Sequence, residues 1–209
     1  MKVSLTIDNG PCDAVTPAVL DVLADKGVYA TFFVLGSQAE RSGAPAILGR
    51  ARAEGHLIGN HTFSHAMLGD YDFAAAREEI ERTQRVLAPF AAERLFRPPA
   101  GGKLHAKLLS RPIYDYLCEA GFTIALWNSV PEDWINPEGW PETALAHARS
   151  QDWAVTVVHD IETGAMRHLA RFIDMVRNEG GVFVRDLPAE VTPVVAGVEL
   201  WPLIGHNFT

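Results

Sequence analysis

The sequence predicts an α/β fold, with one domain built as a distorted (β/α)7-type parallel barrel. Strand-like and helix-like segments alternate along the chain, about seven strands in all, which is the pattern of a parallel sheet. The 209 residues, 48% of them hydrophobic, are enough for one well-packed core and do not require a second. Polar candidates fall at or just beyond the C-terminal ends of the strands, and in a parallel barrel those ends share one rim.

The first strand and helix have clear local signals. Apolar residues alternate over 2–8, which predicts a strand. A helix is expected at 17–26, with Thr16 as its N-cap, Pro17 in the first turn and Gly27 at its end. The β-branched and aromatic run that follows this helix predicts the second strand.

The next elements continue the alternation. The second strand covers residues 28–35, a helix at 45–54 ends at Gly55, and a short strand at 57–59 leads to a pair of histidines. Residues 73–87 form the clearest helix, because Asp72 can cap its N-terminus. Two i,i+4 ion pairs are expected on that helix, Glu78 with Arg82 and Glu81 with Arg85.

The second half of the chain repeats the pattern. Strands are expected at 95–96, 122–127, 153–159 and 182–184, and helices at 111–120, 142–150 and 166–178. The prolines after Arg97 exclude a helix there. We assign residues 1–190 to the barrel, and 191–209 to a C-terminal tail that packs on it or extends from it.

Charge and composition limit the function classes. The net charge is −8 and the Lys and Arg residues are scattered, so neither nucleic acid nor an anionic membrane is an expected partner. A small molecule or an oligosaccharide fits better as substrate, and the oligomeric state is not predicted. There is no apolar run of about 18 residues and no signal-peptide pattern, so we expect a cytoplasmic location unless a leader has been removed. Cys12 and Cys118 are expected to be free thiols.

Two short motifs indicate hydrolytic chemistry. Asp8 follows an apolar strand, where a carboxylate can act as a general base. His61 and His65 are four residues apart, a spacing that on a helical turn would let both rings reach one divalent ion. Asn9 is the discordant residue, because a third, anionic ligand is expected at such a site and this side chain is a neutral amide.

Other polar residues follow later strands. Arg97, Asp133 and His159 come at or after the fourth, fifth and sixth strands, so a barrel would bring them to the rim that carries Asp8 and His61. The candidate residues also have ordinary alternatives. Asp8, close to Gly10-Pro11, could be a turn residue, and His159, after a strand, could be a core residue. The remaining histidines are interpreted as structural or surface residues: His56, His105, His147, His168 and His206.

In order along the chain, these residues resemble the motifs of the polysaccharide deacetylase domain, of the NodB-homology or carbohydrate esterase family 4 type. The resemblance extends from Thr6 to about Val184. The five matching segments are TIDNGP at 6–11, His61 to His65, Arg97-Pro98-Pro99-Ala100-Gly101, a partial match at Val130 to Trp134, and Val157-Val158-His159. Each match is weak alone, but five in order at strand ends are specific.

The resemblance implies a role for each matching residue. Asp8 would be the catalytic base and His159 the general acid, with Arg97 keeping Asp8 ionised and Asp133 keeping His159 protonated. The substrate-binding group would be the backbone N–H of Ala100, which could polarise the acyl oxygen, with Trp134 and Val157 around the acyl methyl.

The implied cofactor is a divalent metal ion, zinc first, with cobalt, nickel or manganese as alternatives. Its ligands would be Asn9, His61 and His65, although the family has Asp at the position of Asn9 and also at that of Val130. Asn9 brings no negative charge, so we expect weaker metal binding. The implied function is a metal-assisted hydrolase that removes an N-linked acetyl group from an amino sugar, a short oligosaccharide or a related small amide. The alternatives are a metal-poor or metal-free amidohydrolase, or a catalytically impaired glycan-binding relative.

Overall fold

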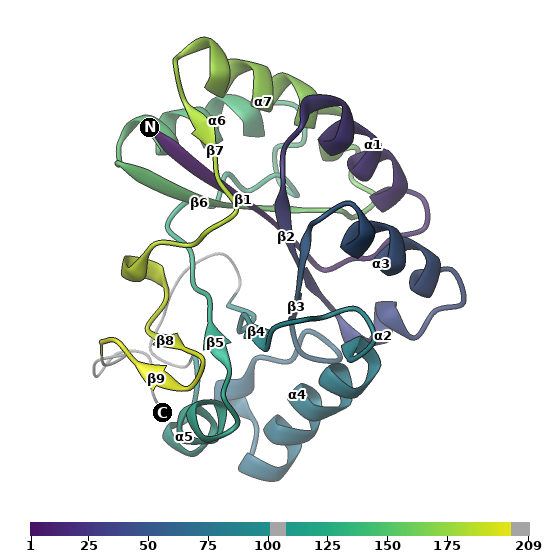
Figure 1. Ribbon diagram of the computed structural model, residues 1–209, viewed down its shortest axis with the longest axis vertical. Coiled ribbons are helices and arrows are strands. Elements are labelled where there is room, and N and C mark those ends of the chain that lie inside the picture. Colours follow the sequence, from purple (N-terminus) through teal and green to yellow (C-terminus); the bar gives the residue numbers. More distant parts are fainter. Residues whose placement is uncertain (101–107, 202–209) are drawn as a thin grey trace.

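The computed structural model of the protein describes residues 1–100 and 108–201. A curved sheet forms its centre and the larger helices lie on the outer side of the curve (Figure 1). The strands are β1 (Lys2–Asp8), β2 (Ala30–Val34), β3 (Leu57–Asn60), β4 (Leu95–Phe96), β5 (Thr123–Ile124), β6 (Trp153–His159), β7 (Val182–Phe183), β8 (Val194–Val195) and β9 (Val198–Glu199).

The pairing of β1 positions the rim of the barrel. The sheet runs in the order β6-β1-β2-β3-β4-β5-β8-β9, with β7 on the first residues of β1, and β1 to β7 pair in parallel. The register of β1 and β6 runs from Lys2 opposite Trp153 to Asp8 opposite His159. Two of the predicted site residues therefore end neighbouring strands at the same level.

Helices cover the strands, and the described buried apolar side chains form three clusters. They are α1 (Thr16–Lys26), α2 (Gly36–Ala39), α3 (Ala44–Ala53), α4 (Phe73–Leu87), α5 (Arg111–Glu119), α6 (Trp140–Arg149) and α7 (Leu169–Asn178), with short 3₁₀ turns at Leu68–Asp70, Ala165–His168 and Ala189–Val191. In α4 the buried residues recur at a helical spacing, Ala76, Ile80, Thr83 and Leu87, and the opposite face is charged. The amphipathic periodicity thus fixes which face of each helix meets the sheet.

Most of the predicted elements are confirmed, with local corrections. The strand expected at 122–127 covers only Thr123–Ile124, and the helix expected at 166–178 begins at Leu169, after a 3₁₀ turn. β1, α4 and β6 have the expected bounds, and Asp72 caps α4 by accepting a hydrogen bond from the backbone N–H of Ala75. Thr16 is wrong as the cap of α1: Val15 takes that position, and the Thr16 hydroxyl donates to Asp160 instead.

One of the two predicted ion pairs on α4 is also wrong. Glu81 does pair with Arg85, at 3.9 Å between Oε2 and Nη1. Arg82 does not pair with Glu78: it pairs with Glu40 and lies over the Phe63 ring. These partners from neighbouring segments provide a negative charge and an aromatic face.

The segment after residue 190 forms structure that the sequence did not predict. β8 and β9 make an antiparallel hairpin, and β8 pairs with β5 through Ile124 and Val194. Gly197 closes the hairpin at φ 81°, and a Cβ there would lie 2.4 Å from the carbonyl oxygen of Cys118. Up to residue 201 the segment extends the sheet, while a boundary at 190 stays a prediction and 202–209 lie outside the described residues.

Several minor expectations can be compared directly. Both cysteines are free thiols and are half-buried. His56 is structural, since its Nδ1 accepts a hydrogen bond from the backbone N–H of Ala30, whereas His105 and His206 lie outside the described residues. Within 1–100 and 108–201, no helix has the length and apolarity needed to span a membrane.

Candidate active site

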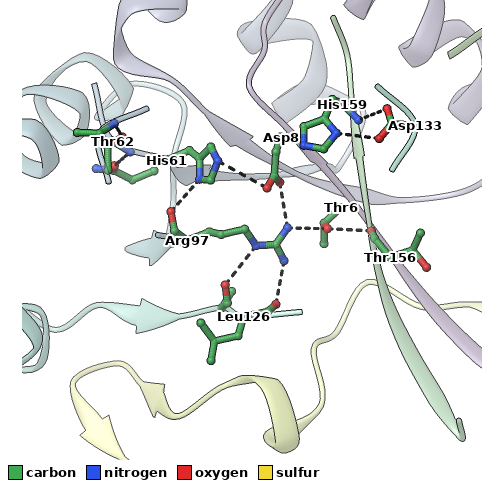
Figure 2. Close-up of polar contacts among 12 residues, drawn as sticks. Thr6, Asp8, His61, Thr62, Arg97, Leu126, Asp133, Thr156 and His159 are labelled. Atoms are coloured by element: carbon green, nitrogen blue, oxygen red, sulfur yellow. Dashed lines mark hydrogen bonds and ion pairs between the residues drawn. The ribbon is translucent and has the colours of Figure 1, made fainter. Parts of the chain in front are cut away.

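The strand ends bring the predicted polar residues together. Asp8 and His159 are the last residues of β1 and β6, and His61 and Arg97 directly follow β3 and β4. Figure 2 shows Asp8 with His61 on one side, the Arg97 guanidinium below it and His159 nearby. The placement at one rim, expected from the parallel pattern, is confirmed.

Arg97 is fully buried and holds the Asp8 carboxylate. Its Nη1 donates to Asp8 Oδ1 at 2.9 Å and to the Thr6 hydroxyl at 2.7 Å. The other guanidinium nitrogens donate to the carbonyl oxygens of Ala125 and Leu126, at 3.2 and 3.1 Å. The ring of Phe33 lies 4.0 Å from the guanidinium carbon and covers one face of it. With each nitrogen hydrogen-bonded, the guanidinium presents a fixed positive charge to Asp8.

Asp133 orients His159 from behind. The His159 ring Nδ1 and the His159 backbone N–H both donate to the Asp133 carboxylate, at 2.8 and 3.0 Å, and Asp133 is fully buried. Burial lowers the pKa of His159, but the hydrogen bond and the charge of Asp133 outweigh it and leave the pKa raised. The ring nitrogen that remains, Nε2, is thus the one available to a ligand.

The two histidines of the second motif lie in a loop, so the helical turn expected from their spacing is wrong. Thr62 and His65 both have φ of 65°, the left-handed region, which no α-helix contains. The two rings still approach each other edge to face, with centroids 5.2 Å apart. The turn of the backbone therefore brings together side chains that helical periodicity was expected to align.

Neighbouring residues that sequence reasoning missed support this loop. The Asn60 side chain accepts a hydrogen bond from the backbone N–H of Thr62, and the Thr62 hydroxyl accepts one from that of Ala66. The Glu79 carboxylate on α4 accepts from the backbone N–H groups of Phe63 and Ser64 and from the Ser64 hydroxyl. A polar residue that faces the site from a helix 15 residues away leaves no local signal in the sequence.

The side chains of the predicted metal site suit a divalent cation. His61 Nδ1 lies 2.8 Å from the carbonyl oxygen of Arg97, which makes Nδ1 the protonated nitrogen and leaves the lone pair on Nε2. Burial lowers the pKa of His61 to about 4 and also lowers that of His65, so both rings are neutral near pH 7, as ligation requires. The Asn9 amide oxygen is buried without a hydrogen-bond partner. A cation bound beside it would give this unpaired buried acceptor a partner.

Asn9 also explains why the site is unusual among metal sites. The residue has φ of 80°, a conformation that Asn tolerates better than most residues. Over the described part of the chain, no three His, Cys, Asp or Glu side chains form a metal-binding group. The candidate set here is two imidazoles and one amide, a donor set with no net charge.

A cavity of about 360 Å³ opens between these residues. Its polar lining is Asp8, Asn9, His61, His65 and His159. Its apolar lining is Pro98, Ala100, Trp127, Val130, Trp134, Val157 and Ile161. Arg97 and Asp133, both fully buried, lie behind this lining and act through the side chains they hold. A donor role for the Ala100 backbone N–H stays a prediction.

Comparison with known proteins identifies the family. Residues 1–122 match the polysaccharide deacetylase family. A chitooligosaccharide deacetylase of Rhizobium leguminosarum bv. trifolii is 36% identical over 164 residues, which cover 76% of this chain and 71% of that protein. The chain belongs to the polysaccharide deacetylase family. Enzymes of this family generally depend on a divalent metal ion.

Relatives and solved structures of polysaccharide deacetylases agree with this assignment. A peptidoglycan-N-acetylglucosamine deacetylase of Bacillus cereus is 33% identical over 189 residues, covering 88% of this chain and 66% of that protein. The structure of the peptidoglycan deacetylase PdaC from Bacillus subtilis matches with a TM-score of 0.70 and 31% identity over 87% of each chain. Other relatives are longer, and the chain spans only 37% of their length.

Asp160 is a buried polar residue next to the candidate site that the sequence analysis missed. It follows His159, is fully buried, and its Oδ2 accepts a hydrogen bond of 2.5 Å from the Thr16 hydroxyl while Oδ1 has no partner. Burial raises the pKa of Asp160 to about 7. The one available signal was its position, directly after the strand end that carries His159.

Proposed function

We propose that this chain is a metal-assisted hydrolase that removes an N-linked acetyl group from an amino sugar or a short oligosaccharide. The observation that carries the proposal is the pairing of a carboxylate and an imidazole at one cavity. Asp8, held by Arg97, and His159, held by Asp133, line the same cavity as the candidate metal ligands. The names of the relatives, chitooligosaccharide and peptidoglycan-N-acetylglucosamine deacetylases, support an N-acetylated sugar as substrate.

The arrangement assigns opposite proton transfers to the two sides of the cavity. Asp8, as a carboxylate, accepts the proton of the attacking water. His159, which its raised pKa keeps protonated, donates from Nε2 to the leaving amine as the C–N bond breaks. Arg97 and Asp133 lie behind the lining of the cavity: Arg97 holds the orientation of Asp8, and Asp133 holds the orientation of His159 and raises its pKa.

A divalent ion held by Asn9, His61 and His65 would supply the Lewis acid that polarises the acyl carbonyl and activates water. Neutral imidazoles and a free amide oxygen can ligate such an ion, but together they contribute no negative charge. We therefore expect the site to bind metal more weakly than a site with a carboxylate at position 9.

A substrate panel tests the proposal directly. Acetylated chitooligosaccharides and small N-acetyl compounds are assayed for released acetate and free amine, with and without added Zn²⁺ or Co²⁺. We expect release that depends on metal and is lost in Asp8→Ala. If nothing in the panel is hydrolysed although Asp8→Ala binds the same compounds as well as the parent does, the hydrolase proposal is wrong.

The substitution Asn9→Asp tests the metal assignment. A carboxylate in place of the amide adds an anionic ligand, so Zn²⁺ affinity and turnover should rise together. Asn178→Asp is the matched control, because it adds the same charge at an exposed position at the end of α7. Calorimetric titration gives the affinity independently of the rate. Unchanged zinc binding with slower turnover would remove His61 and His65 from the role of ligands.

A second candidate follows from the same amide. With no anionic ligand, the chain could bind a glycan without hydrolysing it, or hydrolyse a small amide without metal. Calorimetry with the glycan panel separates the first case, since it predicts affinity without product. The second predicts that chelators leave the rate unchanged and that Asn9→Asp lowers it, because a second carboxylate beside Asp8 would have no cation to balance it.

A further inference from the structure

The two histidines of the candidate metal site are held in different ways. The backbone N–H of His61 donates to the carbonyl oxygen of Val34, and its ring Nδ1 donates to that of Arg97. The His65 ring is half-buried, and in the part of the chain that the structure describes no other residue forms a hydrogen bond with it. The direction of the His65 ring therefore depends on the backbone that carries it.

The carbonyl groups of that loop are held by α2. The first two residues of α2, Gly36 and Ser37, donate their backbone N–H groups to two carbonyl oxygens of the loop, at 3.0 Å each. The acceptors are the carbonyl oxygens of Thr62 and Phe63. Gly36 has no room for a side chain, because a Cβ would lie 2.6 Å from the Phe63 ring and 2.5 Å from the Thr83 hydroxyl. The carbonyl side of the loop thus packs directly against α2.

Glu79 of α4 holds the N–H groups of the same loop. Its Oε2 accepts from the backbone N–H groups of Phe63 and Ser64, at 2.9 and 2.8 Å, and its Oε1 accepts from the Ser64 hydroxyl at 3.0 Å. Hydrogen bonds to a carboxylate are stronger than those between neutral groups. Glu79 therefore fixes the two residues directly before His65.

A second contact closes the turn after His65. The Thr62 hydroxyl accepts a hydrogen bond from the backbone N–H of Ala66, at 3.1 Å. Thr62 and His65 both have φ of 65°, a conformation that persists in such residues only when the surrounding structure enforces it. Glu79 acts on the loop before His65 and Thr62 closes it afterwards, so loss of Glu79 releases one of two constraints on the ring.

We propose that Glu79 is the positioning residue for His65, because its carboxylate oxygens fix the loop so that this imidazole faces the cavity and can reach an ion beside His61. The inference rests on the proposed function and concerns one ligand of its metal site. Glu79 acts through the loop backbone, since it is not among the described residues that line the cavity. His61 should keep its place without Glu79, because Val34 and Arg97 hold it.

Calorimetric titration with Zn²⁺ tests the proposal independently of activity. Glu79→Ala removes the three hydrogen bonds and should weaken zinc binding by about tenfold, the usual order for loss of a group that orients a metal ligand. Glu79→Gln should bind zinc as the parent does, because an amide oxygen can accept both backbone N–H groups. Should Glu79→Ala not fold, Glu79→Asp is the second variant, because its shorter side chain withdraws the carboxylate from the loop.

Two controls separate positioning from charge and from stability. Glu78→Ala removes the same charge from the neighbouring residue of α4, which is 57% exposed and pairs with Arg85. Ile173→Val lowers stability by removing a methylene group from a fully buried side chain of α7, a helix that packs against α1 and α6. Both control variants should keep the parental zinc affinity.

Nitrogen-15 spectra of the metal-free protein report on the two rings separately. In Glu79→Ala the ring signals of His65 should shift or broaden, because the residues before it lose their acceptor. The ring signals of His61 should stay at their parental positions, because the carbonyl oxygen of Arg97 still binds Nδ1. A general loosening of the structure would change both rings.

Zinc binding that is weaker in Glu79→Ala, and parental in Glu79→Gln and in both controls, supports the inference. Parental affinity in Glu79→Ala, or an equal loss in Glu79→Gln or in Ile173→Val, overturns it and leaves the metal assignment intact. If the parent binds no zinc, the metal part of the proposed function fails and the spectra decide the inference. A change confined to His65 then supports the positioning role, and unchanged rings or equal changes in both rings refute it.

Discussion

Replacing Arg97 with methionine should destabilise the protein more than replacing its partner Asp8 with asparagine. Both residues are buried, and a buried ion pair that loses one member leaves the other charge uncompensated. The two ends of this pair are, however, unequal. Without Asp8 the guanidinium keeps three neutral acceptors, the Thr6 hydroxyl and the carbonyl oxygens of Ala125 and Leu126. Without Arg97, the carboxylate keeps only the contact with His61 Nε2 at 3.7 Å among its ion pairs in the described residues, and that ring is neutral near pH 7 because burial lowers its pKa to about 4.

The magnitudes follow from these contacts. Arg97→Met should lower the free energy of unfolding by about 3–5 kcal/mol, the usual cost of an unpaired buried charge. Asp8→Asn removes one charged hydrogen bond and should cost about 1.5–3 kcal/mol. The double variant has no unpaired buried carboxylate, so its loss of unfolding free energy should be smaller than the sum of the two single losses by about 1–3 kcal/mol.

Urea unfolding in chelator-treated buffer measures these free energies without a contribution from bound metal. Arg85→Met is the matched control, because that side chain is 60% exposed and its loss should change stability by less than about 0.5 kcal/mol. If Asp8→Asn costs as much as Arg97→Met, or if the two losses simply add, the unequal dependence of the pair is refuted.

Three further predictions concern the neighbouring groups. Asp133→Asn should move the alkaline limb of the pH–rate profile to lower pH without moving the acid limb, because the charge that raises the pKa of His159 is removed; an unmoved alkaline limb would exclude His159 as the acid. Gly10→Ala should lose both stability and activity, since its Cβ would lie 2.2 Å from Asp160 Oδ2. Adding Asp160→Ala should restore the thermal stability of this variant. Equal melting temperatures for Gly10→Ala and the parent would contradict the contact. The pKa of Asp160 is raised to about 7 from 3.8, so its contribution to stability is complete below pH 3.8 and is lost as the pH rises through 7. Asp160→Asn should therefore lose less unfolding free energy than the parent between pH 4 and pH 8. Parallel stability curves would argue against a buried protonated carboxyl.

The sequence predicted the parts of the site that depend on strand periodicity. Asp8 and His159 end neighbouring strands because an alternating apolar run and a buried apolar run both fix the register of a parallel pair. Asp133 could be paired with His159 from the resemblance to a motif, and the contact is present. Such residues are predictable because one short segment of chain determines each position.

Features that depend on contacts between distant segments were not predictable. Thr62 and His65 take left-handed dihedral angles in a loop whose backbone N–H groups at Phe63 and Ser64 are bound by Glu79 from α4, whereas the four-residue spacing alone suggested a helix. The buried state of Asp160 depends on Thr16, 144 residues earlier in the chain. In each case the deciding partner is distant in sequence and carries no periodic pattern.

The order of synthesis gives the segment that begins at the 3₁₀ turn Ala189–Val191 a particular importance. The backbone N–H of Leu126 donates to the carbonyl oxygen of Val191, and the carbonyl oxygen of Leu126 accepts from Arg97. Likewise β1, which precedes the other strands of this sheet along the sequence, pairs over its longest register with residues 153–159. A nascent chain halted before residue 191 would therefore expose unpaired strand edges, and the Leu126 segment that accepts from Arg97 would lack its hydrogen bond to Val191. Catalytic competence should appear late and abruptly during translation, once the last part of the sheet has been made.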